Sequence, residues 1–170
     1  MKKLLLMVLF AIVAVSASAQ RNINIWWGGN VSDISGDVDA KSEFKALNIG
    51  VSYTAPIDDK FDWSVGAGWI TKGVKHWSPG YIQIEGNGAW NFYKNSAGKV
   101  GIFTGPYLSF MATKDDAEDV NSVDFGWQGG IAAAYSFLTF KMGYEFGFCN
   151  MIQEVDSKSG DFFFRIGVRF

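Results

Sequence analysis

The sequence is poor in the residues that build cross-links and metal centres, because its 170 residues include one Cys, one His and three Pro. One cysteine cannot close an intramolecular disulfide or supply a thiolate metal site, which excludes a fold held together by disulfides or zinc. The formal net charge of −2 gives no electrostatic support for a nucleic-acid partner. Charged residues form 19% of the chain, below the roughly 25% typical of soluble domains. By contrast, 20 Gly, 15 Phe, 7 Trp and 6 Tyr make the chain rich in both glycine and aromatic residues.

The N-terminus has the pattern of a secretory signal peptide. A basic start at Lys2-Lys3 is followed by an apolar run of twelve residues, Leu4 to Val15, and then by small residues ending at Ala19. The run is too short for a membrane-spanning helix, which needs about 20 residues. We therefore expect a signal peptide at residues 1–19 and one domain at residues 20–170. No later apolar run reaches spanning length, so any crossing of a membrane must use strands.

Hydrophobic residues in the remaining chain recur at every second position, which is the period of a β-strand. Leu47, Ile49, Val51 and Tyr53, for example, alternate with small or polar residues. Alternating segments lie at 21–29, 47–54, 61–69, 82–92, 100–111, 123–137, 138–148 and 162–170. Their connections are short at 56–60, 94–99 and 136–139, and long and polar at 30–43, 73–80, 112–122 and 150–160. This pattern predicts an all-β fold, an eight-stranded antiparallel up-and-down transmembrane β-barrel, with both termini on the short-turn, periplasmic side.

The distribution of glycine, charge and aromatic residues favours apolar residues facing lipid and polar residues filling the lumen. Small residues and potential ion partners share the polar face, and aromatic residues gather near strand ends, as in interfacial girdles. We expect a lumen network of Glu85, Lys141, Glu145, Arg165 and Arg169. Alternation blurs at Trp26-Trp27, and residues 100–111 are apolar on both faces, which leaves the register of both strands open.

Several segments together resemble the small eight-stranded outer-membrane β-barrel domain family, often labelled porin-like. They are Gly28 to Asp37, the strand-turn-strand from Ile49 to Gly73, Gly105-Pro106-Tyr107, Val123 to Gly126 and the last strand ending on Phe170. The resemblance spans essentially the whole chain after residue 19. It implies an integral outer-membrane protein and supplies no catalytic residues. Phe170 is expected to anchor the barrel at the lipid interface, and a terminal Phe looks like the signal that barrel-assembly machinery reads.

Catalytic and metal-binding patterns are mostly missing from the sequence. The spacing of His76 and Ser78 resembles the His-x-Ser of outer-membrane lipid A deacylases, but Pro79 follows directly and no orienting acid stands at a fixed spacing. Carboxylates gather at 33–39 and 115–119 without the spacing of a calcium loop. We therefore expect no catalytic site, no metal and no cofactor, and interpret both acidic segments as surface loops.

The sequence predicts a bacterial outer-membrane barrel that is not an enzyme and acts as a structural or surface-interaction module. Its partners would be outer-membrane lipids and, during insertion, the assembly machinery; the pattern identifies no surface partner. One alternative is a narrow porin-like channel for small solutes, although eight strands leave little room inside. A second alternative is a lipid A-modifying enzyme that uses His76 and Ser78.

Overall fold

The computed structural model describes residues 22–36, 43–73, 79–113, 121–150 and 157–170, and these form a closed barrel of eight antiparallel strands. The strands are β1 (Ile23–Gly36), β2 (Glu43–Pro56), β3 (Phe61–Thr71), β4 (Gly80–Lys94), β5 (Gly98–Thr113), β6 (Val123–Tyr135), β7 (Leu138–Asn150) and β8 (Ser157–Arg169). The predicted fold class and strand number are therefore confirmed. Within the described ranges, no helix combines the length and the apolar character that a membrane span requires.

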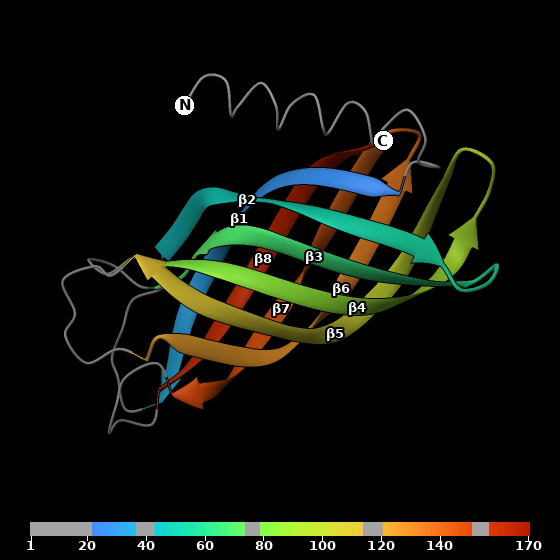
Figure 1. Cartoon of the computed structure of the whole chain (residues 1–170). Coiled ribbons are helices and arrows are strands. Elements are labelled where there is room, and N and C mark those ends of the chain that lie inside the picture. The colour runs from blue at the N-terminus through green and yellow to red at the C-terminus, as the bar shows by residue number, and fades with distance from the viewer. Residues whose placement is uncertain (1–21, 37–42, 74–78, 114–120, 151–156) are drawn as a thin grey trace, which may run out of the picture.

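Each strand pairs with its neighbours in the chain, and β1 pairs with β8 to close the barrel. This last pairing runs from Asn24 opposite Arg169 to Gly36 opposite Ser157, and Figure 1 shows the blue first strand beside the red last one. The backbone N–H of Phe170 donates to the carbonyl of Ile23 at 2.8 Å, so the pairing extends to the chain end. Closure leaves no unpaired sheet edge, the condition that strands must meet to cross a bilayer.

Side chains alternate between an apolar outer face and a polar lumen. On β4, Ile84 is 46% exposed, whereas Gln83 and Glu85 on either side are 2% and 6% exposed. On β5, Leu108 is 37% exposed and Ser109 is fully buried. The predicted alternation is thus confirmed, and it places the apolar residues outside and the polar ones inside. A soluble barrel would carry the reverse arrangement.

Two of the connections predicted as long loops are partly strand, which corrects the sequence interpretation. β1 continues to Gly36, and Asn30 and Ser32 on it are 1% and 2% exposed. β8 begins at Ser157, so that Asp161 lies within the strand. These polar residues resemble a loop in the sequence because the lumen that they face is itself polar. Asp33, assigned to an acidic loop, is an exposed strand residue, and residues 37–42 and 114–120 lie outside the described ranges.

The doubled tryptophan does not break the alternation of β1. Trp26 points into the lumen and is 5% exposed, whereas Trp27 points outward and is 52% exposed. The irregularity falls instead in the pairing of β1 with β2, between Gly28 and Asn30. The indole of Trp26 fits inside the barrel because Gly68 has no side chain: a Cβ there would lie 2.7 Å from the Trp26 ring. β5 is apolar on both faces because Phe103 and Tyr107 are aromatic residues that point into the lumen, as Trp26 does on β1.

Candidate functional site

The middle of the lumen is crossed by an ion-pair network that we call the central cluster, formed by Glu85, Lys141, Glu145 and Arg165. Arg165 Nη1 lies 2.6 Å from Glu85 Oε2, and its Nη2 lies 3.2 Å from Glu145 Oε1. Lys141 Nζ lies 3.0 Å from the other oxygen of Glu85. Because these residues come from β4, β7 and β8, the pairs span the barrel interior. Four of the five predicted network residues are thus brought together.

Inward-facing aromatic rings support the cations of the central cluster. The guanidinium of Arg165 lies 4.3 Å from the ring centre of Trp26 and 4.5 Å from that of Phe163. The ammonium of Lys141 lies 4.2 Å from the ring centre of Phe103. Cations at this distance from an aromatic face are attracted by the ring quadrupole, and the attraction grows when water is excluded. The rings therefore hold both cations in the lumen while filling space around them.

Two glutamines connect the carboxylates of the central cluster to the neighbouring strands. Gln83 donates from Nε2 to Glu145 at 2.8 Å, and its oxygen accepts a hydrogen bond from Ser109 at 2.7 Å. Gln128, which is fully buried, donates to Glu85 at 3.0 Å. Carboxylates out of contact with water need such donors, because an unsatisfied buried charge is costly.

A second network, here the outer cluster, surrounds Lys72 on the side of the long connections. The Lys72 side chain is fully buried and its Nζ lies 2.9 Å from Asp124, 3.4 Å from Glu145 and 3.8 Å from Asp161. Its ammonium also lies 4.2 Å from the ring centre of Tyr107. Glu145 belongs to both clusters, so the two networks form one continuous polar core.

Hydrogen bonds from β1 and β2 complete the surroundings of Asp161. Ser32 and Asn30 both donate to Asp161, the latter at 3.0 Å. Asn48 in turn donates to the Asn30 oxygen at 2.7 Å, and its own oxygen accepts from the backbone N–H of Thr71. Hydrogen bonds therefore connect Asp161 of the outer cluster, on β8, with β1 and, through Asn30, with β2.

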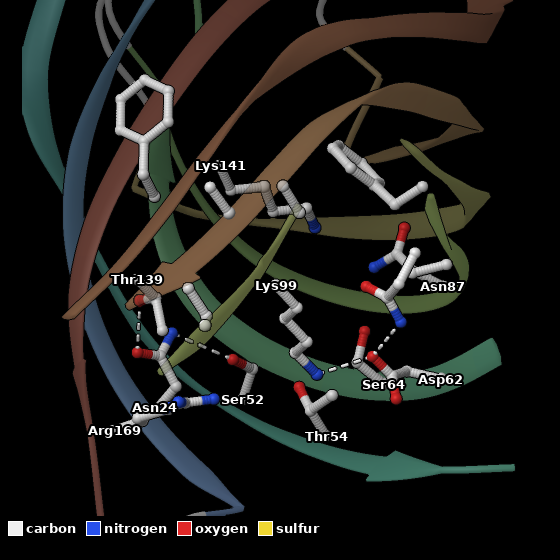
Figure 2. A pocket seen from close by; sticks show the side chains of 18 of the residues that line it. Asn24, Ser52, Thr54, Asp62, Ser64, Asn87, Lys99, Thr139, Lys141 and Arg169 are labelled. Carbon is white, nitrogen blue, oxygen red and sulfur yellow. Dashed lines mark hydrogen bonds and ion pairs between the residues drawn. The ribbon is translucent and has the colours of Figure 1, made fainter. Parts of the chain in front are cut away.

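The half of the lumen at the short-turn end, which the sequence predicts to face the periplasm, holds a pocket of about 370 Å³, and we call it the periplasmic pocket after that prediction. Its wall includes Asn24, Asp62, Asn87 and Lys99, which Figure 2 shows around the cavity. Lys99 extends to Asp62 and pairs with it at 2.6 Å. Asp62 also accepts a hydrogen bond from Asn91 at 2.7 Å. Because Lys141 and Arg165 also line it, the pocket ends at the central cluster.

The remaining sequence-predicted residues lie away from the central cluster. Arg169 lines the periplasmic pocket, and its Nε donates to the carbonyl of Ser136 in the β6–β7 turn at 2.6 Å. Phe170 is 37% exposed beside the start of β1, and its role as an assembly signal stays a prediction. His76 and Ser78 lie outside the described residues. In the described part of the chain, no group of His, Cys, Asp or Glu side chains is arranged to hold a metal ion.

The outer cluster was not predicted from the sequence, although its residues follow the same two-residue period as the other inward-facing residues. Asp124 is in phase with Gln128 on β6, and Asp161 is in phase with Arg165 on β8. Lys72 continues the inward phase of Ile70 one step past the end of β3. Asp124 already lies within the predicted segment 123–137, and extending the segments 61–69 and 162–170 by three residues and one residue would have found Lys72 and Asp161.

Comparison with known proteins finds similar structures and no similar sequence. No protein-family model and no curated protein sequence matches the chain. Among solved structures, the outer membrane enzyme PagL matches with a TM-score of 0.59 and 9% identity, covering 86% of this chain and 99% of that one. Neisserial surface protein A matches with a TM-score of 0.54 and 14% identity, covering 87% and 97%. The N-terminal β-barrel domain of Pseudomonas aeruginosa OprF matches with 0.51 and 8%, covering 87% and 98%.

These similarities agree with the chemistry of the two faces. Membrane-spanning barrels carry an apolar outer band around a polar interior, and this is the arrangement that the side chains of the present barrel adopt. The lipid-facing surface is formed by residues such as Ile84, Leu108 and Phe125, all on the outside of the closed sheet. The chain has the fold of the small eight-stranded outer-membrane barrels, and its faces suit a protein of the bacterial outer membrane.

Proposed function

We propose that the protein is a closed outer-membrane barrel that acts as a structural or surface-interaction module, without catalysis and without a continuous pore. The observation that carries this proposal is the pair of ion clusters across the lumen. Lys72, Glu145 and Arg165 are each at most 4% exposed, and together they connect the two clusters. Side chains that are paired and out of contact with water occupy the space that a solute would need.

The cost of charge burial supports a packed lumen over an ion pathway. A buried ion pair recovers its desolvation penalty only when geometry and additional hydrogen bonds are good. Here Glu85 is bonded to Arg165, Lys141 and Gln128 at 2.6, 3.0 and 3.0 Å. A carboxylate with that many partners is held in place, and an ion passing through would have to break several of these bonds at once.

Planar bilayer recording tests whether the lumen is closed. Refolded protein is incorporated into bilayers, and its insertion is verified by a heat-modifiable band from the same vesicles. We expect no stepwise conductance from the wild-type protein, while a conducting porin inserted from a parallel preparation gives steps. Discrete steps from the wild-type protein that change in Glu85→Gln or Arg165→Gln would instead support the narrow channel.

Cysteine labelling on intact cells tests the proposed outward presentation of the long connections. In a Cys149→Ser background, Asp116→Cys places a thiol in a long connection, and Ser96→Cys places one in the short β4–β5 turn. We expect a membrane-impermeant maleimide to label Asp116→Cys on intact cells and Ser96→Cys only after the outer membrane is permeabilised. The reverse order would show that the barrel is oriented the other way and would end the proposal of a surface module.

A further inference from the structure

The periplasmic pocket carries more positive than negative charge. Its cationic wall residues are Lys94, Lys99, Lys141, Arg165 and Arg169. Among the described residues that line it, Asp62 is the only carboxylate. From beyond the pocket, Glu85 pairs with Lys141 and Arg165, and Glu145 pairs with Arg165. An excess of cations in a cleft with low-dielectric walls concentrates anions inside it.

Two buried hydrogen-bond donors in the same wall have no partner among the described residues. They are Nε1 of Trp26 and Nδ2 of Asn87. Both side chains line the periplasmic pocket, and the residues are 5% and 7% exposed. The oxygen of Asn87 already accepts from Gln128 at 3.0 Å, so the amide is oriented with its NH₂ group left over. Nearly all buried polar groups in native proteins are satisfied by protein or by ordered water, so these two donors are groups that a water molecule or an acceptor atom of a ligand in the cavity would satisfy.

The remaining wall is part apolar, with residues such as Ala132, Ala133 and Phe140, and part neutral polar. Asn24 donates to Ser52 at 3.4 Å and accepts from Thr139 at 2.7 Å, and Figure 2 shows this chain of hydrogen bonds at one side of the cavity. Thr54 and Ser64 also line the pocket. The hydroxyls, amides and cations of the polar part suit an oxygen-rich solute, whereas the single carboxylate, already paired with Lys99, gives a cation little to bind.

We propose that the periplasmic pocket binds a small oxyanion, a phosphorylated or carboxylated solute, taken up from the periplasmic side and held without crossing the barrel. The volume of about 370 Å³ lies in the range of small-molecule sites. The ligand's oxygens accept from Asn87 and Trp26 while its charge faces Lys99 and Lys141. Access is from the end where Lys94 and Ser96 lie at the β4–β5 turn, and the central cluster closes the other end.

NMR spectroscopy of the folded protein in lipid nanodiscs tests this proposal directly. Inorganic phosphate, glycerol 3-phosphate, acetate and neutral glycerol are titrated separately, with the indole N–H of Trp26 assigned by Trp26→Phe and the side-chain amide of Asn87 by Asn87→Leu. We expect saturable shifts of both signals with phosphate, glycerol 3-phosphate or acetate and no saturable shift with glycerol. Whichever anion saturates at the lower concentration identifies the class of solute.

Three variants connect the binding to the pocket. Asn87→Leu removes the free donor, and also the oxygen that accepts from Gln128, with little change in volume, and we expect the affinity for the anion to fall about 3- to 10-fold. Lys99→Gln removes a cation, and we expect a fall of about 10-fold or more. Lys158→Gln makes the same charge change at the exposed start of β8, at the opposite end of the barrel, and should leave the affinity unchanged.

The outcomes separate this proposal from the closed-barrel function. Absence of saturable shifts with every anion, equal shifts with glycerol, or equal loss of affinity in Lys158→Gln would each overturn the pocket assignment. A heat-modifiable band shows that each variant is folded. If either Asn87→Leu or Lys99→Gln misfolds, the other variant still tests the pocket. Bilayer conductance is measured separately, so a silent barrel that binds no anion would leave the proposed function intact.

Discussion

Replacing Lys72 by Met removes the one cation at the centre of the outer cluster. Its Nζ lies within 3.8 Å of carboxylate oxygens of Asp124, Glu145 and Asp161, and its side chain is fully buried. Breaking a buried ion pair by deleting one partner costs about 3–5 kcal/mol, because the remaining charge is left uncompensated. The carboxylates keep some hydrogen bonds, for example from Tyr107 to Asp124 at 3.1 Å. We therefore expect Lys72→Met to lower the free energy of unfolding by an amount within this range of about 3–5 kcal/mol.

Urea titration in short-chain lipid vesicles, followed by the heat-modifiable band and by tryptophan fluorescence, measures this loss. The double variant Lys72→Met/Asp161→Asn removes one charge of each sign, and we expect it to recover about 1–3 kcal/mol relative to additivity. Lys60→Met, in the exposed β2–β3 turn, is the matched control and should stay within about 0.5 kcal/mol of wild type. A Lys72→Met barrel as stable as Lys60→Met, or a double variant with no recovery, would show that Lys72 does not compensate the three carboxylates.

The remaining predictions concern packing and turns. Gly68→Val places a methyl group against the Trp26 ring, since even a Cβ at Gly68 would lie 2.7 Å from it, and should destabilise the barrel by about 1–3 kcal/mol and alter the near-ultraviolet circular dichroism. An unchanged spectrum would contradict the close packing. Ser136 has φ of 52° in the β6–β7 turn, so Ser136→Gly should raise the free energy of unfolding by about 0.5 kcal/mol, and with it the urea midpoint, because glycine adopts this conformation without strain. A lower midpoint would argue against that backbone. Backbone N–H groups of Lys60 and Phe61 hold the pKa of Asp58 below its usual value, so Asp58 stabilises the turn above the unfolded pKa, and this support is lost as pH falls through the folded pKa. The protection factors of these two amides, which compare the measured exchange rate with the intrinsic rate at the same pH, should therefore fall at acidic pH in wild type and be low at all pH values in Asp58→Ala. Equal protection factors in the two proteins at neutral pH would contradict this prediction.

The fold could be predicted from the sequence because the two faces of each strand differ so strongly in polarity. Strand number follows from the alternation at every second residue. Strand order follows from the short turns at 56–60 and 94–99 and from the longer connections at the other end of the barrel. Strand ends were harder to predict, because a polar lumen makes inward residues such as Asn30 and Ser32 look like loop residues. Both residues donate hydrogen bonds to Asp161, which lies more than a hundred positions away in the sequence. No local sequence pattern predicts a contact over that separation.

The polar core was predictable as a set of residues and not as a set of pairs. The inward phase identified Glu85, Lys141, Glu145 and Arg165 because charged residues on a narrow lumen must be compensated. Which cation meets which carboxylate depends on the relative stagger of β4, β7 and β8, and this is fixed only when β1 pairs with β8. The periplasmic pocket was missed for the same reason, since its wall comes from all eight strands.

The central property of this barrel is that lipid meets its apolar outer face while its lumen is packed and polar. Intermolecular nuclear Overhauser effects in nanodiscs measure this on the native protein. We predict cross-peaks from lipid acyl chains to the methyl groups of Ile84, Leu108 and Val168, and none to the side-chain amides of Gln83 and Gln128, whose exchange with water should be slow. Acyl-chain cross-peaks to the two glutamines, or rapid exchange of their amides with water, would contradict the account.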